Sequence, residues 1–156
     1  MSGKIIGGLI VGFALAAGAA IYYLQIYAFY DRVSEEAANM RLTLLASDAP
    51  ETILVEEFEA IDGTSSPLRF RACFRTPLST AMLTETYVLY EGAEPLVAPP
   101  WFDCFDAAGI GAALEDGRAI AFLGERNITQ GIDRVVAVLD NGQAYAWHQL
   151  NEVYRK

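Results

Sequence analysis

The sequence has 156 residues, of which 53% are hydrophobic, and a formal net charge of −9 at neutral pH. This acidic excess argues against nucleic acid as a partner, because phosphate backbones attract basic surfaces. All 20 acidic residues and 10 of the 11 basic residues lie in residues 31–156, which therefore carry a net charge of −10. A segment of that length suits one domain with its own core.

The first element is an apolar run, Ile5–Tyr30, with no charged residue and no histidine in 26 residues. About 20 apolar residues in a helix cross the hydrocarbon core of a bilayer. Ala17-Gly18-Ala19 resembles a signal-peptide cleavage site, but the apolar run continues beyond it. The apolar region of a signal peptide usually ends after about 7–15 residues. We therefore predict an uncleaved signal anchor.

The flanking charges predict the orientation of this anchor. Lys4 and the amino terminus lie on one side, and the other flank has mixed charges with no basic excess. The positive-inside rule then places the N-terminus in the cytoplasm. Aromatic residues cluster between Tyr22 and Tyr30, where amphipathic rings favour the headgroup zone. The rest of the chain is expected outside the cytoplasm.

Small residues recur at every fourth position of the anchor: Gly8, Gly12, Ala16 and Ala20. Such a ridge lets a second helix approach the backbone closely, which is how helices associate in lipid. We interpret it as a helix-packing interface. The alternative is that glycine and alanine are simply common in membrane helices.

Local patterns predict an α+β domain after the anchor. Residues 31–40 are expected to be a stalk or a helix extension. Strands are predicted at 40–46, 52–58, 68–75, 86–90 and 118–123, followed by a C-terminal hairpin. Helices are predicted at 78–85 and 107–114. Together these elements predict a mainly antiparallel sheet that is covered by one main helix, at 107–114.

The hairpin has Asn141-Gly142 at its tip, which is typical of a two-residue type I′ turn. Such a turn would place Val138 opposite Tyr145 and Val136 opposite Trp147. Bulky side chains would then share one face of the hairpin.

Cys73 and Cys104 are the only cysteines, and His148 is the only histidine. Outside the cytoplasm, a pair of cysteines favours a disulfide, here closing a loop of about 30 residues. Two buried thiols, or a redox or metal role, are the alternatives. A metal site needs several convergent ligands, so His148 is expected to be a hydrogen-bonded strand residue.

Arg69, Arg71 and Arg75 alternate along the predicted strand at 68–75 and share one face. They could bind an anion or the carboxylates of a partner. Alternatively, they pair internally with the acidic residues between 56 and 62.

Three runs behind the anchor carry a resemblance: RFRACF (69–74), WFDCFDAAGIGAALE (101–115) and DRVVAVLDNGQAYAWHQ (133–149). With the anchor ending YYLQIYAFY, they resemble a family of short single-span proteins of alphaproteobacteria, a domain of unknown function. The resemblance covers nearly the whole chain. It implies a bacterial inner-membrane protein with a periplasmic domain. Together with the flanking charges, this gives a cytoplasmic N-terminus and anchor (1–30) and a periplasmic domain (41–156). The resemblance supplies no catalytic residue.

These observations favour a non-enzymatic protein without a cofactor. The first hypothesis is an accessory or assembly subunit of an integral inner-membrane complex. A respiratory complex such as a cytochrome oxidase is the first guess, and a basic periplasmic protein is a possible partner of the acidic domain. The second hypothesis is an anchored ligand- or anion-binding module that uses the three arginines. The third is a thiol- or copper-handling protein.

Overall fold

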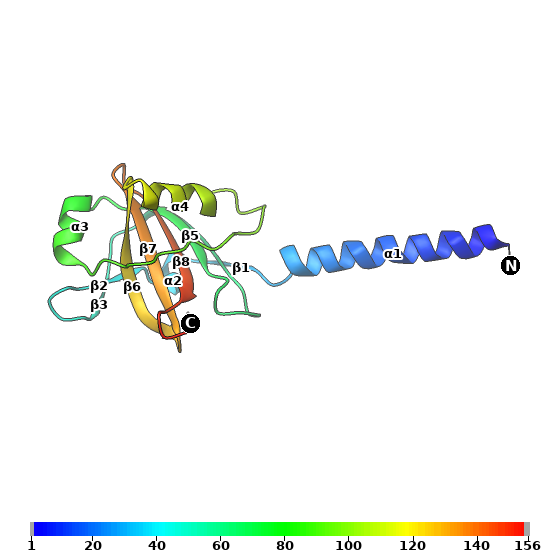
Figure 1. Ribbon diagram of the computed structural model, residues 1–156, viewed down its shortest axis with the longest axis horizontal. Coiled ribbons are helices and arrows are strands. Elements are labelled where there is room, and N and C mark those ends of the chain that lie inside the picture. Colours follow the sequence, from blue (N-terminus) through cyan, green and yellow to red (C-terminus); the bar gives the residue numbers. More distant parts are fainter. Residues whose placement is uncertain (1, 155–156) are drawn as a thin grey trace.

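The long N-terminal helix leads directly into a domain of strands and short helices in the computed structural model, which describes residues 2–154 (Figure 1). The helices are α1 (Gly3–Ile26), α2 (Glu35–Ala38), α3 (Thr80–Thr86) and α4 (Ala107–Glu115). The strands are β1 (Asp31–Val33), β2 (Arg41–Thr43), β3 (Pro50–Thr52), β4 (Glu56–Asp62), β5 (Arg71–Arg75), β6 (Ala119–Thr129), β7 (Ile132–Leu139) and β8 (Gln143–Leu150). The predicted α+β class is confirmed.

Helix α1 has 24 residues and is about 36 Å long. None of its residues is buried, and it projects away from the domain (Figure 1). It is long and apolar enough to cross a membrane, and a signal sequence would have the same features. The chain therefore begins with either a membrane anchor or a signal sequence.

The main sheet has six strands in the order β1-β4-β5-β8-β7-β6, and every neighbouring pair is antiparallel. Strands β2 and β3 form a separate antiparallel pair. The mainly antiparallel sheet is thus confirmed.

The stalk or helix extension predicted at 31–40 is wrong. Strand β1 pairs with β4, with Val33 opposite Ala60. Ala38 and Met40 are buried in the core. The segment is polar overall, but these widely spaced apolar side chains are enough to bind it to the domain.

Each face of the main sheet packs against a different part of the chain. One face carries Phe74 and Val136. It lies against Met40 and Leu42, in and next to β2, and against Leu83 of α3. Strand β5 therefore has both faces buried, since Cys73 belongs to the cluster on the other side.

The opposite face carries Val135 and Trp147. It packs against Phe102 and Phe105, from the connection that precedes α4, and against Ile110 of α4 itself. Helix α4 is thus the main helix on this face, at the predicted position.

The predicted register of the hairpin is wrong by one residue. Val138 lies opposite Ala144, and Val135 lies opposite Trp147. Gly142 has φ +85°, whereas Asn141 is not among the residues with positive φ, as a type I′ turn would require. The connection is therefore a longer loop that ends in a left-handed glycine. Shifting the pairing of β8 with β7 by one residue exchanges the two faces on which the side chains of β8 lie.

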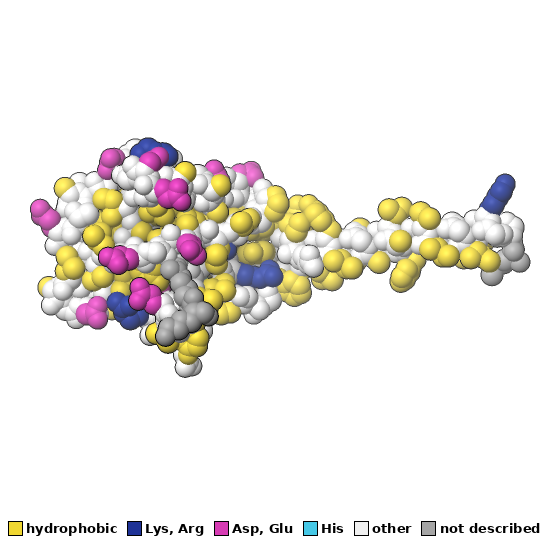
Figure 2. Space-filling view, in the orientation of Figure 1, with side chains coloured by type: hydrophobic (Ala, Val, Ile, Leu, Met, Phe, Trp, Pro, Cys, Tyr) yellow, Lys and Arg dark blue, Asp and Glu magenta, His cyan; other side chains and the backbone are white. Residues whose placement is uncertain are grey.

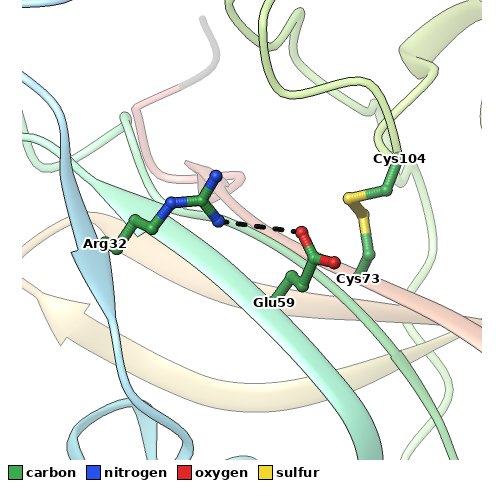
Figure 3. Close-up of a disulfide and its surroundings, with 4 residues drawn as sticks. All are labelled: Arg32, Glu59, Cys73 and Cys104. Atoms are coloured by element: carbon green, nitrogen blue, oxygen red, sulfur yellow. Dashed lines mark ion pairs between the residues drawn. A yellow bond between two sulfur atoms is a disulfide. The ribbon is translucent and has the colours of Figure 1, made fainter.

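Cys73 of β5 and Cys104, just before α4, form a disulfide with a Cα–Cα distance of 6.3 Å. Figure 3 shows the bond beside β4, next to an exposed ion pair of 3.7 Å between Arg32 and Glu59. An exposed pair of this kind contributes little to stability. The disulfide instead fixes the connection that covers the second face of the sheet. Together with the apolar helix α1, it is typical of a membrane-anchored or secreted extracytoplasmic domain.

Replacing both Cys73 and Cys104 with serine should lower the free energy of unfolding by about 3–4 kcal/mol, because the unfolded chain regains the freedom of a 31-residue loop. Urea unfolding of the domain, followed by circular dichroism, measures this loss. Unfolding of the wild type in strong reductant should give the same value. Equal stability of the oxidised wild type and the double variant would contradict a stabilising bond.

Candidate functional site: the helix–domain junction

Four residues, Tyr27 to Tyr30, separate the end of α1 from the first strand of the sheet. The indole N–H of Trp101 donates a hydrogen bond of 2.7 Å to the carbonyl oxygen of Ile26 in the last turn of α1. The carbonyls of a last helical turn have no partner within the helix, so this bond satisfies one of them. The domain itself therefore caps the helix.

Aromatic rings surround this hydrogen bond. Tyr27 stacks on Trp101 with 6.0 Å between ring centroids, and Tyr30 meets the same indole edge-on at 6.0 Å. The guanidinium of Arg69 lies 5.0 Å from the ring centroid of Tyr30 and 6.0 Å from that of Phe29. We refer to Tyr27, Phe29, Tyr30, Arg69 and Trp101 as the junction cluster. Hydrophobic side chains gather where the helix meets the domain (Figure 2).

Gly63, in the loop after β4, completes the packing. A Cβ atom at Gly63 would lie 2.6 Å from the carbonyl oxygen of Phe29 and would also clash with the side chain of Arg69. Only glycine allows the loop to approach the backbone of residue 29 this closely. Three distant parts of the chain thus meet at the end of α1.

Arg71, at the start of β5, holds two of these parts in place. It is 4% exposed, and its guanidinium donates to the carbonyl oxygens of Leu96 (2.9 Å), Leu68 (2.7 Å), Phe70 (2.6 Å) and Val97 (3.0 Å). Burial lowers the pKa of Arg71 to about 10, so the side chain remains a cation at neutral pH. The loops before β5 and before Trp101 are therefore anchored to one buried charge.

The three predicted arginines do not form one open face. Arg71 is covered by the connection between residues 91 and 105, Arg69 lies in the junction cluster, and Arg75 donates to the carbonyl oxygen of Asn141 at 2.8 Å. None of the ion pairs within residues 2–154 joins these arginines to the acidic residues between 56 and 62. Backbone carbonyls and rings, instead of carboxylates, are the partners that they contact.

His148 is a buried structural residue, in keeping with the expectation for it. Its Nδ1 lies 2.8 Å from the carbonyl oxygen of Pro67, so Nδ1 carries the proton, and its Nε2 accepts a bond of 3.1 Å from Arg134 Nε. The imidazole stacks on Phe70 at 4.8 Å. Burial and the neighbouring cation of Arg134 lower the pKa of His148 to about 4.

The small-residue ridge of α1 is open. Gly8, Gly12, Ala16 and Ala20 are all exposed, and no atom of another element lies within 4 Å of a Cβ placed at Gly8 or Gly12. The ridge therefore remains available to a second helix.

The domain also carries a groove of about 610 Å³ between α4, the start of β6 and the connection after residue 88. Ala107 and Leu114 are among its apolar lining residues, whereas Glu91, Glu94 and Glu115 line it with acidic groups. Within residues 2–154, no group of three or more His, Cys, Asp or Glu side chains could hold a metal ion. The groove thus combines apolar and negatively charged lining residues.

Sequence reasoning missed the contact between Trp101 and Ile26, which are 75 residues apart. One signal was present: a tryptophan after two prolines, in a chain whose apolar N-terminal run ends in a tyrosine cluster. Both are residue types that favour a membrane interface.

Arg71→Lys should lower the free energy of unfolding by about 2–4 kcal/mol, because an ammonium group cannot reach four carbonyls in the planar arrangement of a guanidinium. Amide exchange near Leu96 and Val97 should accelerate. The matched control is Arg75→Lys on the same strand, which replaces one hydrogen bond at a half-buried site and should cost under about 1 kcal/mol. Equal losses for the two variants would contradict the role of Arg71.

The stability of the domain should depend on pH through His148. Because its pKa is about 4 when folded and about 6.5 when unfolded, the unfolded chain binds the proton first as the pH falls. The stabilisation is complete above pH 6.5 and is lost towards pH 4, by about 2 kcal/mol between pH 7 and pH 5. Urea midpoints at both pH values test this.

His148→Gln is the control, since an amide can make both hydrogen bonds and does not titrate. The variant should lose most of the pH dependence. Asp62, whose pKa is raised by burial, acts in the opposite direction in both proteins, so the difference between the wild type and the variant isolates His148. An unchanged slope in His148→Gln would assign the pH dependence to other groups.

Comparison with known proteins yields one match. Residues 40–156 match DUF6446, a family of unknown function. No curated protein and no solved structure matches the chain. The matched region includes strands β4 to β8 of the main sheet, the disulfide, Arg71 and Trp101, but neither α1 nor β1. Since it covers more than half of the sequence, the chain belongs to the DUF6446 family of unknown function.

Proposed function

We propose that this protein is a non-catalytic accessory or assembly subunit of an integral membrane complex. Helix α1 is its uncleaved anchor in a bacterial inner membrane, with the N-terminus in the cytoplasm and the domain in the periplasm. Lys4 before the apolar run and the similarity to single-span alphaproteobacterial proteins support this location.

The observation that carries the proposal is the helix–domain junction. Trp101 caps the last turn of α1, Gly63 packs on residue 29, and β1 joins the sheet directly. The orientation of the helix in the membrane therefore determines where the domain points. Such rigidity suits a subunit that places a domain against a defined surface of a neighbouring complex.

The exposed ridge of α1 provides a contact for that complex within the membrane. Between helices in lipid, close backbone contact and packing take the place of the hydrophobic effect. Gly8, Gly12, Ala16 and Ala20 present only backbone and small side chains along one side of α1.

The acidic domain provides the second contact. The groove beside α4 is lined by apolar residues and three glutamates, which suits an apolar segment with basic flanks. A respiratory complex that meets basic cytochromes remains the first partner to test, because a net charge of −10 steers basic proteins towards the domain.

Ala16→Ile should reduce the amount of partner recovered with the protein by about tenfold, because the new side chain separates the helices. The measurement is affinity purification from native membranes in mild detergent, with the partner quantified by mass spectrometry. Ala14→Ile is the matched control: at about 100° per residue, Ala14 lies opposite the centre of the ridge. It should leave recovery unchanged.

Two results would contradict the proposal. One is migration of the wild-type protein alone at monomer mass in mild detergent. The other is equal partner recovery with Ala14→Ile and Ala16→Ile, which would exclude the ridge as the contact.

A further inference from the structure

We infer that the junction cluster is a docking surface for the polar zone of the bilayer, and that Arg69 binds the phosphate of an anionic lipid there. The inference rests on the proposed membrane anchor, and it goes further by assigning a partner to the end of the domain that faces α1. It concerns lipid contact by the folded domain, beyond the insertion of the helix.

The position of the cluster follows from the anchor. Trp101 contacts the last turn of α1, so a helix that spans the bilayer brings this indole to the surface of the hydrocarbon core. Tryptophan and tyrosine favour this zone because their rings are apolar and their N–H and O–H groups are polar. The cluster thus has the composition of an interfacial belt, although its residues come from separate parts of the chain.

Exposed apolar side chains extend this surface. Tyr27 is 43% exposed, Phe29 is 40% exposed and Val97, near the junction in the connection held by Arg71, is 81% exposed. Figure 1 shows that the loop around residue 65 and the connection before α4 both lie at the end of the domain nearest α1. Large apolar groups left exposed at this end are accommodated if the end rests on the membrane.

Arg69 indicates which lipid group is bound. Its side chain is half-buried, and its guanidinium lies over the rings of Tyr30 and Phe29. No ion pair within the described residues includes Arg69. An uncompensated cation beside the end of a span lies at the depth of the lipid phosphates, and guanidinium pairs strongly with phosphate oxygens.

The Arg69 side chain packs against Gly63 and the residues that follow α1. The absence of a side chain at Gly63 leaves room for the Arg69 side chain, and Arg71 holds the carbonyl of Leu68 next to it. The cation therefore lies beside residues 29 and 30, at the end of α1.

Fluorescence of the full chain in vesicles tests the docking. The chain has two tryptophans: Trp101 in the cluster and Trp147, which is 0% exposed in the core of the domain. Vesicles of phosphatidylcholine and phosphatidylglycerol would carry bromine at the upper or the lower part of the acyl chains. We expect quenching of Trp101, strongest with the upper bromines, and no quenching in Trp101→Phe, which retains only Trp147.

The lipid preference tests Arg69. Two kinds of vesicle are compared: in one only the phosphatidylglycerol is brominated, and in the other only the phosphatidylcholine. The ratio of the quenching in the two gives the relative occupancy of the two lipids next to Trp101. One basic residue at the surface should favour the anionic lipid about fivefold. Arg69→Gln should abolish the preference. The control Arg118→Gln, which removes a cation paired with Asp116 at the end of α4, should keep it.

Alkaline extraction of the same vesicles separates the two proposals. If the protein resists extraction but Trp101 is not quenched, the domain stands away from the bilayer and the docking inference fails while the anchor remains. If the protein is extracted, the anchor itself fails. Quenching without preference for the anionic lipid, or equal preference in wild type and Arg69→Gln, would overturn the role of Arg69.

Discussion

The Arg71 guanidinium remains charged at neutral pH although only 4% of the residue is exposed. Moving a cation out of water costs several kcal/mol, and only well-aligned hydrogen bonds offset this cost. Arg71 meets the requirement with carbonyl groups from two loops, at residues 68–70 and 96–97. These loops are therefore coupled. If either loop moves away from the sheet, the buried Arg71 guanidinium loses hydrogen-bond acceptors.

This coupling reaches helix α1 through few further contacts. The 96–97 loop leads to Trp101, whose indole binds the carbonyl of Ile26, and the other loop presents Arg69 beside Tyr30. The disulfide between Cys73 and Cys104 fixes the same connection from its far end. We propose that these contacts hold helix α1, with its open ridge of small residues, and the domain, with its acidic groove, in one fixed orientation. That property links the fold to the proposed role of positioning a domain against a membrane complex.

The sequence was informative where the determining interaction is local. Period-two alternation placed β5, the only two cysteines formed the expected bond, and α4 lies at the predicted position. The predicted hairpin register was wrong because Asn141-Gly142 is compatible with both a two-residue type I′ turn and a longer loop that ends in a left-handed glycine. The two differ in the backbone conformation of Asn141. The partners of Arg71 were missed for a different reason. Charge pairing suggested carboxylates, whereas its acceptors are backbone carbonyls, which carry no signature in sequence.

The central claim, that α1 and the domain form one rigid body, can be tested most directly with residual dipolar couplings of backbone amides. The full chain, aligned in lipid bicelles, gives couplings for residues 3–26 and for the six-stranded sheet. We expect one alignment tensor to fit both sets, with equal magnitude and orientation. Two tensors, with a smaller magnitude for the domain, would show that the domain moves independently of its helix and would contradict the account.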